Sequence, residues 1–162
     1  MDISFFLVTY LQSRIDASCK SIELYIADQL NDKAIEIIFK DDGSKLVSNN
    51  MAYLRLSDLE KQFHGQLSHL YHKGQTIVNL EFNQHSQRTI KLGNFHSLLG
   101  ITMINNPKTP ILFTIISKKG EYILNSNSII SSFTSEELKK KEVLEYMNEL
   151  LFSHISEVTD SL

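Results

Sequence analysis

The first 19 residues carry apolar side chains at a spacing of four positions. Such spacing keeps side chains on one face of an α-helix, so the pattern predicts a helix over about residues 3–19. Asp2 and the absence of a basic leader favour a helix over a signal peptide in this apolar start. The stripe consists of Ile3, Leu7, Leu11, Ile15 and Cys19.

A two-residue alternation follows the helix. Apolar side chains alternate with polar or mixed ones over residues 22–26, which predicts a strand. An apolar run at 34–39 predicts a second strand, separated from the first by a short polar turn. Asp41, Asp42 and Gly43 close the second strand, since an Asp-Gly pair after an apolar run is a turn signal.

The middle of the chain predicts a helix followed by a hairpin. Residues 54–63 have a helical pattern with Ser57 as a candidate start, and Gly65 is a typical helix stop. Two short strands joined by a tight turn follow, at 67–71 and 76–82.

The rest of the chain predicts two helices around a second hairpin. Thr134 and Glu137 have the capping-box spacing that starts the terminal helix. The predicted elements are a helix over about 94–104, strands at 111–116 and 121–124, and a helix over about 135–154.

The order of these elements is helix, strand, strand, helix, strand, strand, which is not a βαβ alternation. It predicts an α+β protein, with an antiparallel or mixed sheet and helices on one face. A polar connector at residues 83–89 divides the chain. We therefore expect a first domain over residues 1–84 and a small α+β extension over residues 85–162.

Composition and charge narrow the function classes. The chain has 162 residues, of which 42% are hydrophobic, enough for a core. A net charge of -3 argues against nucleic-acid binding, which needs a basic face. The single cysteine, Cys19, excludes an internal disulfide and a Cys-rich zinc site, and fits a cytoplasmic setting. No apolar run approaches the roughly 18 residues of a membrane span, so we expect no membrane contact.

The element order and three short motifs resemble the GHKL ATP-binding fold, the class of gyrase B, MutL and the histidine-kinase catalytic domain. The first-helix motif of that class, E-N-S-x-D-A-G, aligns with residues 12–18, where Asp16 and Ala17 match. The D-x-G motif is present as Asp41-Asp42-Gly43, and Gly74-Gln75-Thr76 is similar to the start of the final hairpin motif, G-T-T. The resemblance implies a two-layer, Bergerat-like sandwich.

A closer resemblance is to the small GHKL-like proteins encoded beside iron-only hydrogenases. Those proteins carry an extension that contains L-G-D, a helix, N-P, a hairpin and a terminal helix. Leu92-Gly93-Asn94 and Asn106-Pro107 fall at the same separation here. This resemblance implies a hydrogenase or redox context.

The resemblance also implies a nucleotide site. In the GHKL class the D-x-G carboxylate accepts a hydrogen bond from the adenine amino group, and its glycine lets the base approach the backbone. Asp41 and Gly43 could do the same here, with Thr76, Ser13 and Asp16 as further nucleotide contacts. The alternative is that the polar residues at the end of the first helix line a polar groove or cap the helix.

Hydrolysis, by contrast, is expected to be lost. The GHKL class uses a helix Asn to bind Mg²⁺ and the preceding Glu to activate water, but these positions hold Ser13 and Gln12. Its Gly-rich lid is replaced by about ten residues, 44–53, without a glycine. We therefore expect no catalytic residue and no metal site, with ATP or ADP at most a weak ligand.

Other reactive side chains have simpler explanations. His69 and His72 lie on opposite faces of their predicted strand, so with His64 they are expected to be exposed histidines rather than metal ligands. Cys19 extends the apolar stripe and is expected to be buried rather than catalytic. The lysines at 139–141 are expected to form a solvated helix face.

Two functions remain, and we favour a non-catalytic regulatory or scaffold protein that acts through protein contacts. Phe5, Phe6 and Tyr10 surround the first helix with apolar area beyond one stripe. This favours a protein partner or a homodimer, with core packing as the commoner explanation. The alternative is an adenine-nucleotide-binding switch that uses Asp41 and Gly43 with little or no hydrolysis. The two differ in whether the pocket beside Asp41 is open or filled by side chains.

Overall fold

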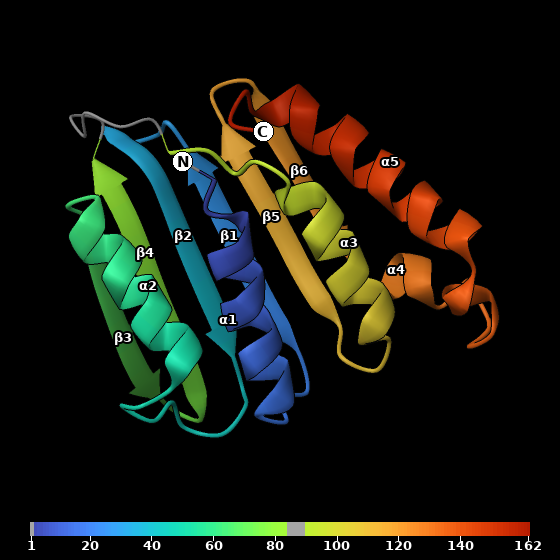
Figure 1. The fold of residues 1–162 in the computed structure, drawn as a ribbon, viewed down its shortest axis with the longest axis horizontal. Coiled ribbons are helices and arrows are strands. Elements are labelled where there is room, and N and C mark those ends of the chain that lie inside the picture. The colour runs from blue at the N-terminus through green and yellow to red at the C-terminus, as the bar shows by residue number, and fades with distance from the viewer. Residues whose placement is uncertain (1, 84–89) are drawn as a thin grey trace.

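One six-stranded sheet organises the fold (Figure 1). The computed structural model describes residues 2–83 and 90–162, and in this part the strands are ordered β3-β4-β2-β1-β5-β6. Neighbouring strands are antiparallel except for β1 and β5, which are parallel. The strands are β1 (Ile22–Asp28), β2 (Lys33–Asp41), β3 (Gln66–His72), β4 (Gln75–Asn83), β5 (Ile111–Ser117) and β6 (Gly120–Asn125).

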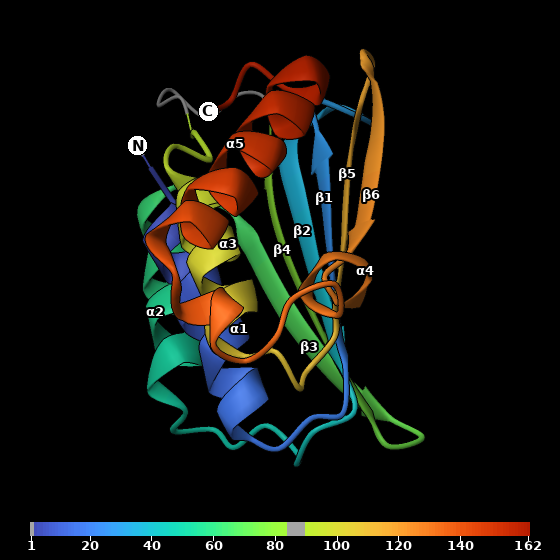
Figure 2. The same ribbon diagram turned by 90° about the vertical axis from the view of Figure 1, so that its right-hand side faces the viewer.

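The long helices cover one face of this sheet, and none of the long helices in the described residues lies on the other face (Figure 2). The predicted α+β class is confirmed, and the sheet, which the sequence left open as antiparallel or mixed, is mixed. None of the helices in the described part of the chain combines the length and the apolar character needed to cross a bilayer. The helices are α1 (Ser4–Asp16), α2 (Met51–Gln62), α3 (Phe95–Asn105), the short α4 (Asn127–Ile130) and α5 (Lys141–Val158).

The strands alternate between a side that faces the helices and an open side, as their sequences predict. In β1, Ile22, Leu24 and Ile26 are buried beneath the helices, whereas Glu23 is exposed. Buried side chains from both predicted parts of the chain belong to one hydrophobic cluster. The helices and the sheet therefore share a single core.

The sheet runs through both predicted parts of the chain. β5 pairs with β1 in parallel, beginning with Ile22 opposite Ile111. Most of the predicted connector, residues 84–89, lies outside the described residues. The strands before and after it are members of the same sheet, so β5 and β6 widen the sheet that the first four strands begin.

The last residues of the chain fasten the extension to the end of β1. The buried carboxylate of Asp28 accepts hydrogen bonds from the hydroxyl groups of Thr159 and Ser161. The carbonyl of Ser161 in turn accepts from the N–H groups of Leu92, at 2.6 Å, and Gly93, at 3.2 Å. These bonds satisfy polar groups that burial would otherwise leave unpaired. They join three segments that lie far apart in the sequence.

α2 begins earlier than the sequence pattern predicts. The side chain of Asn50 accepts a hydrogen bond of 2.9 Å from the N–H of Tyr53, so Asn50 is the N-cap and Met51 the first helical residue. The predicted start at Ser57 is therefore wrong, and Ser57 lies inside the helix. An asparagine cap without an acidic residue three positions on gives a weak sequence signal.

α2 ends near the predicted position, but for a different reason from the one that the sequence suggested. His64, with a φ of 54°, adopts the left-handed conformation, not Gly65. Gly65 is required by space, because a Cβ there would lie 2.6 Å from the Phe82 ring and 2.7 Å from the Glu81 carbonyl oxygen. The prediction of a stop at this point holds, but the reason is a close approach to β4.

The predicted capping box forms, although it does not start the terminal helix. The Thr134 hydroxyl oxygen accepts from the N–H of Glu137 at 3.2 Å, and the Glu137 carboxylate accepts from the N–H of Thr134 at 3.0 Å. These two bonds begin a 3-10 turn, Glu137–Lys139, and α5 starts only at Lys141. The predicted helix over 135–154 is thus shifted to Lys141–Val158.

The cap of α2 gives a test of this boundary. We expect Asn50→Ala to lower the free energy of unfolding by about 1 kcal/mol, because the N–H of Tyr53 loses its acceptor. Asn49→Ala, one residue earlier in the exposed loop, is the matched control and should change the free energy by less than about 0.5 kcal/mol. Urea denaturation followed by circular dichroism measures both. Equal losses would show that Asn50 is not the cap.

Candidate functional site around Arg14 and Asp41

A buried arginine on α1 is the feature that the sequence analysis missed. The buried residues of α1 include Leu7, Tyr10 and Arg14, whereas Ile15, which the four-residue spacing placed on the stripe, is only half-buried. Spacings of three and four alternate on a helix with 3.6 residues per turn, so the inner face turns from Leu11 to Arg14. Arg14 lies seven residues after Leu7, and that heptad spacing was the available signal. The predicted helix over 3–19 ends instead at Asp16.

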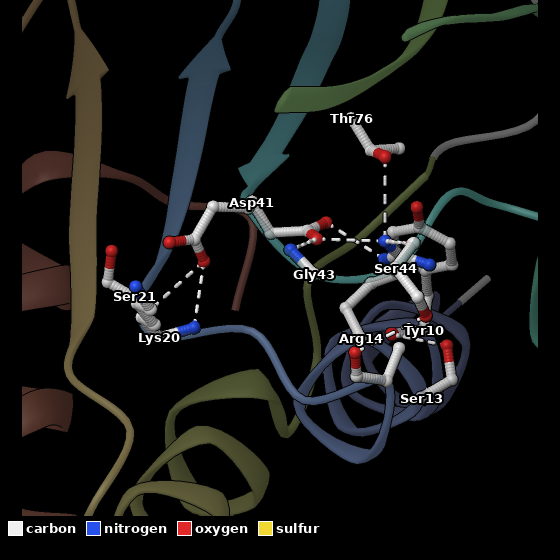
Figure 3. Close-up of polar contacts among 11 residues, drawn as sticks. Tyr10, Ser13, Arg14, Lys20, Ser21, Asp41, Gly43, Ser44 and Thr76 are labelled. Carbon is white, nitrogen blue, oxygen red and sulfur yellow. Dashed lines mark hydrogen bonds and ion pairs between the residues drawn. The ribbon is translucent and has the colours of Figure 1, made fainter. Parts of the chain in front are cut away.

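Arg14 and Asp41 form a two-point ion pair in the core (Figure 3). The Nε of Arg14 donates to Asp41 Oδ2 and its Nη2 donates to Oδ1, each at 2.9 Å. The two side chains are 2% and 0% exposed, so water does not screen the pair. Burial lowers the pKa of Arg14, but the hydrogen bonds and charge of Asp41 outweigh it and hold that pKa above its ordinary value.

Three further contacts complete the surroundings of the pair. Nη2 of Arg14 also donates to the carbonyl oxygen of Ser44 and to the hydroxyl of Thr76, the latter at 3.4 Å. The N–H of Gly43 donates to Asp41 Oδ1 at 2.9 Å. The guanidinium therefore joins α1 to the end of β2, to the loop after it and to the start of β4. Both oxygens of the Asp41 carboxylate already accept hydrogen bonds from the protein itself.

The other two residues of the D-x-G motif also have internal partners. A Cβ on Gly43 would lie 3.0 Å from Asp41 Oδ1 and 3.1 Å from the carbonyl oxygen of Ala17, so this glycine fits a tight contact with the end of α1. Oδ1 of Asp42 accepts from the N–H of Lys20 at 2.7 Å and from that of Ser21 at 3.3 Å (Figure 3). The motif thus holds the turn between α1 and β1 against the end of β2.

Tyr10 lies beside this pair and contributes an unusual polar group. Its ring packs edge-on against Phe39, with centroids 4.8 Å apart, and the side chain is fully buried. Burial raises the pKa of Tyr10, partly offset by the charge of Arg14. Its hydroxyl has no hydrogen-bond partner among the described residues. Tyr10, which the sequence left open as partner surface or core, is core.

The remaining predicted nucleotide contacts lie elsewhere. The Ser13 hydroxyl donates to the carbonyl oxygen of Tyr10 at 2.8 Å, within α1. Gln12 donates to the exposed Asp16 at 2.9 Å and exchanges hydrogen bonds with Asn106 at 2.8 and 3.3 Å. The structure therefore brings Asp41, Gly43 and Thr76 together but leaves Ser13 and Asp16 outside the cluster.

Ser13 and Asp16 instead line a surface groove between α1, α2 and α3. The groove has a volume of about 610 Å³, and Arg55 and Asn50 contribute to its polar part. Its apolar lining includes Phe5, which is 58% exposed. This matches the sequence-based alternative that the polar residues at the end of the helix line a groove.

The other candidate residues do not form a reactive cluster in the described residues. No group of three or more His, Cys, Asp or Glu side chains in residues 2–83 and 90–162 is arranged to hold a metal ion. His64 and His72 are exposed, and His69 Nδ1 lies 2.9 Å from the hydroxyl of Tyr53. The lysines at 139–141 are exposed as predicted but do not form a helix face, because Lys139 ends the 3-10 turn, Lys140 is extended and only Lys141 belongs to α5. Cys19 is buried, also as predicted.

Comparison with known proteins adds a fold and no activity. No protein-family model matches the chain, and no curated protein matches it. A solved structure described as the N-terminal domain of a DNA repair protein aligns with 85% of this chain and 55% of its own, with a TM-score of 0.55. The chain thus spans about half the length of that structure. At 14% sequence identity the likeness shows a shared α+β architecture alone.

Substitution of Arg14 tests the structural role of the buried ion pair. We expect Arg14→Met to lower the free energy of unfolding by about 3–5 kcal/mol, because it leaves the Asp41 charge buried without its partner. Adding Asp41→Asn to Arg14→Met should recover part of this loss, since no charge then remains. Arg55→Met, on the exposed side of α2, is the matched control, with an expected change within about 0.5 kcal/mol. Similar losses for Arg14→Met and Arg55→Met would contradict the assignment.

Cys19 gives a pH-dependent test. Burial, with the charges of Asp41 and Asp42, raises the pKa of the Cys19 thiol to about 11, whereas an unfolded thiol titrates near ~8.5. The folded state therefore binds more protons between these values. The stability contributed by the neutral thiol is complete below pH ~8.5 and is lost as the pH rises towards 11.

Alkylation of Cys19 measures this shift. At pH 9 the folded protein should react with iodoacetamide at least tenfold more slowly than the urea-unfolded protein, because burial limits access to the thiol and leaves little of it as thiolate. Cys19→Ser combined with Ser48→Cys moves the thiol to an exposed loop and should react at the unfolded rate. Rapid alkylation of folded Cys19 would show that the thiol is accessible and ionised.

Proposed function

We propose that this protein is a non-catalytic regulatory or scaffold protein on a degenerate GHKL-like fold, acting through contacts with other proteins. The observation that carries the proposal is the Arg14–Asp41 ion pair. In the class that the sequence resembles, the corresponding aspartate receives the adenine amino group. Here the guanidinium of Arg14 takes that role from within the chain.

The energy of the pair supports this reading over nucleotide binding. A base that used Asp41 would have to displace two charge-assisted hydrogen bonds at a side chain with no exposed surface. Breaking a buried ion pair costs about 3–5 kcal/mol, which lowers affinity by roughly two to three and a half orders of magnitude. An adenine nucleotide would therefore bind weakly if it bound at this position.

The segments at the positions that hold the nucleotide phosphates in the GHKL class support the same proposal. Nine residues, 42–50, separate the end of β2 from the start of α2, too few for a Gly-rich lid over a triphosphate. Ser13, at the position of the metal-binding asparagine, donates its hydroxyl to its own helix backbone. Gln12 has no carboxylate to activate water and is engaged with Asn106.

Surface chemistry supports action through protein contacts. The groove between α1, α2 and α3 presents exposed apolar side chains, with Phe5 58%, Met51 66% and Ile101 37% exposed. Apolar side chains that converge on a groove are typical of protein-binding surfaces. The hydrogenase or redox context follows from the sequence resemblance alone. The described part of the fold contains nothing that would select it.

The adenine-nucleotide switch remains the alternative, and it makes a distinct demand on the structure. Arg14 would have to leave Asp41 when nucleotide binds, so that binding and a rearrangement at the end of α1 would be coupled. Calorimetry separates the two functions.

We expect no measurable heat when the purified protein is titrated with ATP, ADP or a non-hydrolysable ATP analogue at millimolar concentration, with or without Mg²⁺. Asp41→Asn tests the adenine contact, and Asp42→Asn is the matched control because it removes the neighbouring carboxylate. Binding that is retained in Asp42→Asn, lost in Asp41→Asn and indifferent to Mg²⁺ would overturn the proposal in favour of the nucleotide switch.

A further inference from the structure

The free edge of β3 lacks the sequence features that usually prevent two sheet edges from pairing. Among the strands of residues 2–83 and 90–162, β3 is the outermost beside β4, and the six-stranded sheet ends there (Figure 1). Its seven residues include no Lys, Arg, Asp, Glu or Pro, and its register with β4 is continuous from Gln66 to His72. Leu70 is 57% exposed and Tyr71 is 45% exposed. Natural edge strands are normally blunted by charge, proline, bulges or a covering element.

The opposite edge is protected. β6 is one residue shorter and carries Glu121, next to Lys118 and Lys119 in the turn before it. The short helix α4 follows β6 directly and packs against it. The contrast singles out β3 as the edge that is open to another strand.

The turn after β3 fixes which backbone groups point outwards. Lys73 and Gly74 have φ angles of 50° and 76°, as a two-residue type I′ turn requires. Such a turn closes on a hydrogen-bonded pair, His72 with Gln75, and hydrogen-bonded pairs then alternate along the ladder. The N–H and C=O groups of Leu67, His69 and Tyr71 therefore face the free edge.

We propose that two copies of this chain pair along β3, antiparallel and centred on His69, to form one continuous twelve-stranded sheet. With His69 opposite His69, Leu67 of each copy lies opposite Tyr71 of the other. All three outward-facing residues then fall in hydrogen-bonded pairs, which gives about six interchain hydrogen bonds. A shift of the centre to a neighbouring residue leaves outward groups of β3 unpaired.

The side chains favour a second copy over a strand of another protein. The outward groups are spaced symmetrically about His69, so the edge is complementary to itself. β3 itself has no charged side chain that would select an oppositely charged partner. The Lys45 ammonium lies 5.8 Å from the centre of the Tyr71 ring, and the antiparallel pairing places the Lys45 side chains of the two copies at opposite ends of the paired strands. Leu67 opposite Tyr71 makes an aliphatic–aromatic cross-strand contact twice in the dimer. This inference does not depend on the proposed function, because the edge lies on β3 and not at Asp41.

Sedimentation velocity over a wide concentration range tests the dimer. His69→Pro removes the central outward N–H without breaking a bond to β4, a position that an edge strand tolerates. His69→Ala is the matched control, since it loses the same imidazole contact to Tyr53 but keeps the N–H. We expect the wild type and His69→Ala to dimerise with rising concentration, and His69→Pro to self-associate at least tenfold more weakly. A monomeric wild type, or equal association of the two variants, would overturn the proposal.

Mixing two cysteine variants tests the register. In the proposed pairing Ser68 of one copy lies opposite Leu70 of the other, within disulfide range, whereas like residues are offset by two positions. Mild oxidation of Ser68→Cys mixed with Leu70→Cys should give a disulfide-linked dimer, and either variant alone should not. The native Cys19 is buried and does not compete.

A variant on the other edge of the sheet supplies the control for that mixture. Ile123→Cys on β6 has the same 57% exposure as Leu70 and should not cross-link with Ser68→Cys. Equal cross-linking of Ser68→Cys with Leu70→Cys and with Ile123→Cys would show random collision and contradict the register. Absence of the disulfide-linked dimer in the first mixture would contradict it as well.

Discussion

The ion pair between Arg14 and Asp41 is the constraint on which the first half of the fold depends. A buried charge is tolerated only when its partner and hydrogen bonds are in place. Here one guanidinium contacts the end of β2, the loop at Ser44 and the start of β4 at Thr76. The position of α1 over the sheet is therefore fixed by directional hydrogen bonds as well as by apolar packing. The hydrophobic stripe of α1 alone would allow the helix to slide or rotate.

The same pair changes the meaning of the D-x-G motif. Each residue of the motif has a task within the chain: Asp41 holds Arg14, Asp42 caps the turn before β1, and Gly43 fits against Ala17. A carboxylate whose two oxygens both bind a neighbouring cation has a structural role, because it connects two parts of the fold. In the two proposals above, contacts with other proteins are therefore made by surfaces that the core does not use, namely the helix groove and the open edge of β3.

Much of the fold could be predicted from local signals, because strand alternation and turn residues act over a few positions. The β3–β4 and β5–β6 hairpins follow from such signals, and so does the helix-covered side of the strands. Predicted helix boundaries were wrong where the same local signal can begin more than one kind of structure. The bonds between Thr134 and Glu137 form as expected but begin a 3-10 turn. The parallel pairing of β1 with β5 depends on residues about 90 positions apart, which no local pattern encodes.

The candidate site shows a different limit, because its key residue was visible and misread. A strict spacing of four places Ile15 on the inner face of α1, whereas the true helical period carries that face to Arg14. Once Arg14 faces inwards, its charge demands an acidic partner within reach, and Asp41 at the end of β2 is that partner. A D-x-G motif should therefore be interpreted together with the helix that packs against it. In this chain both oxygens of the buried Asp41 carboxylate already accept hydrogen bonds, from Arg14 and from the N–H of Gly43.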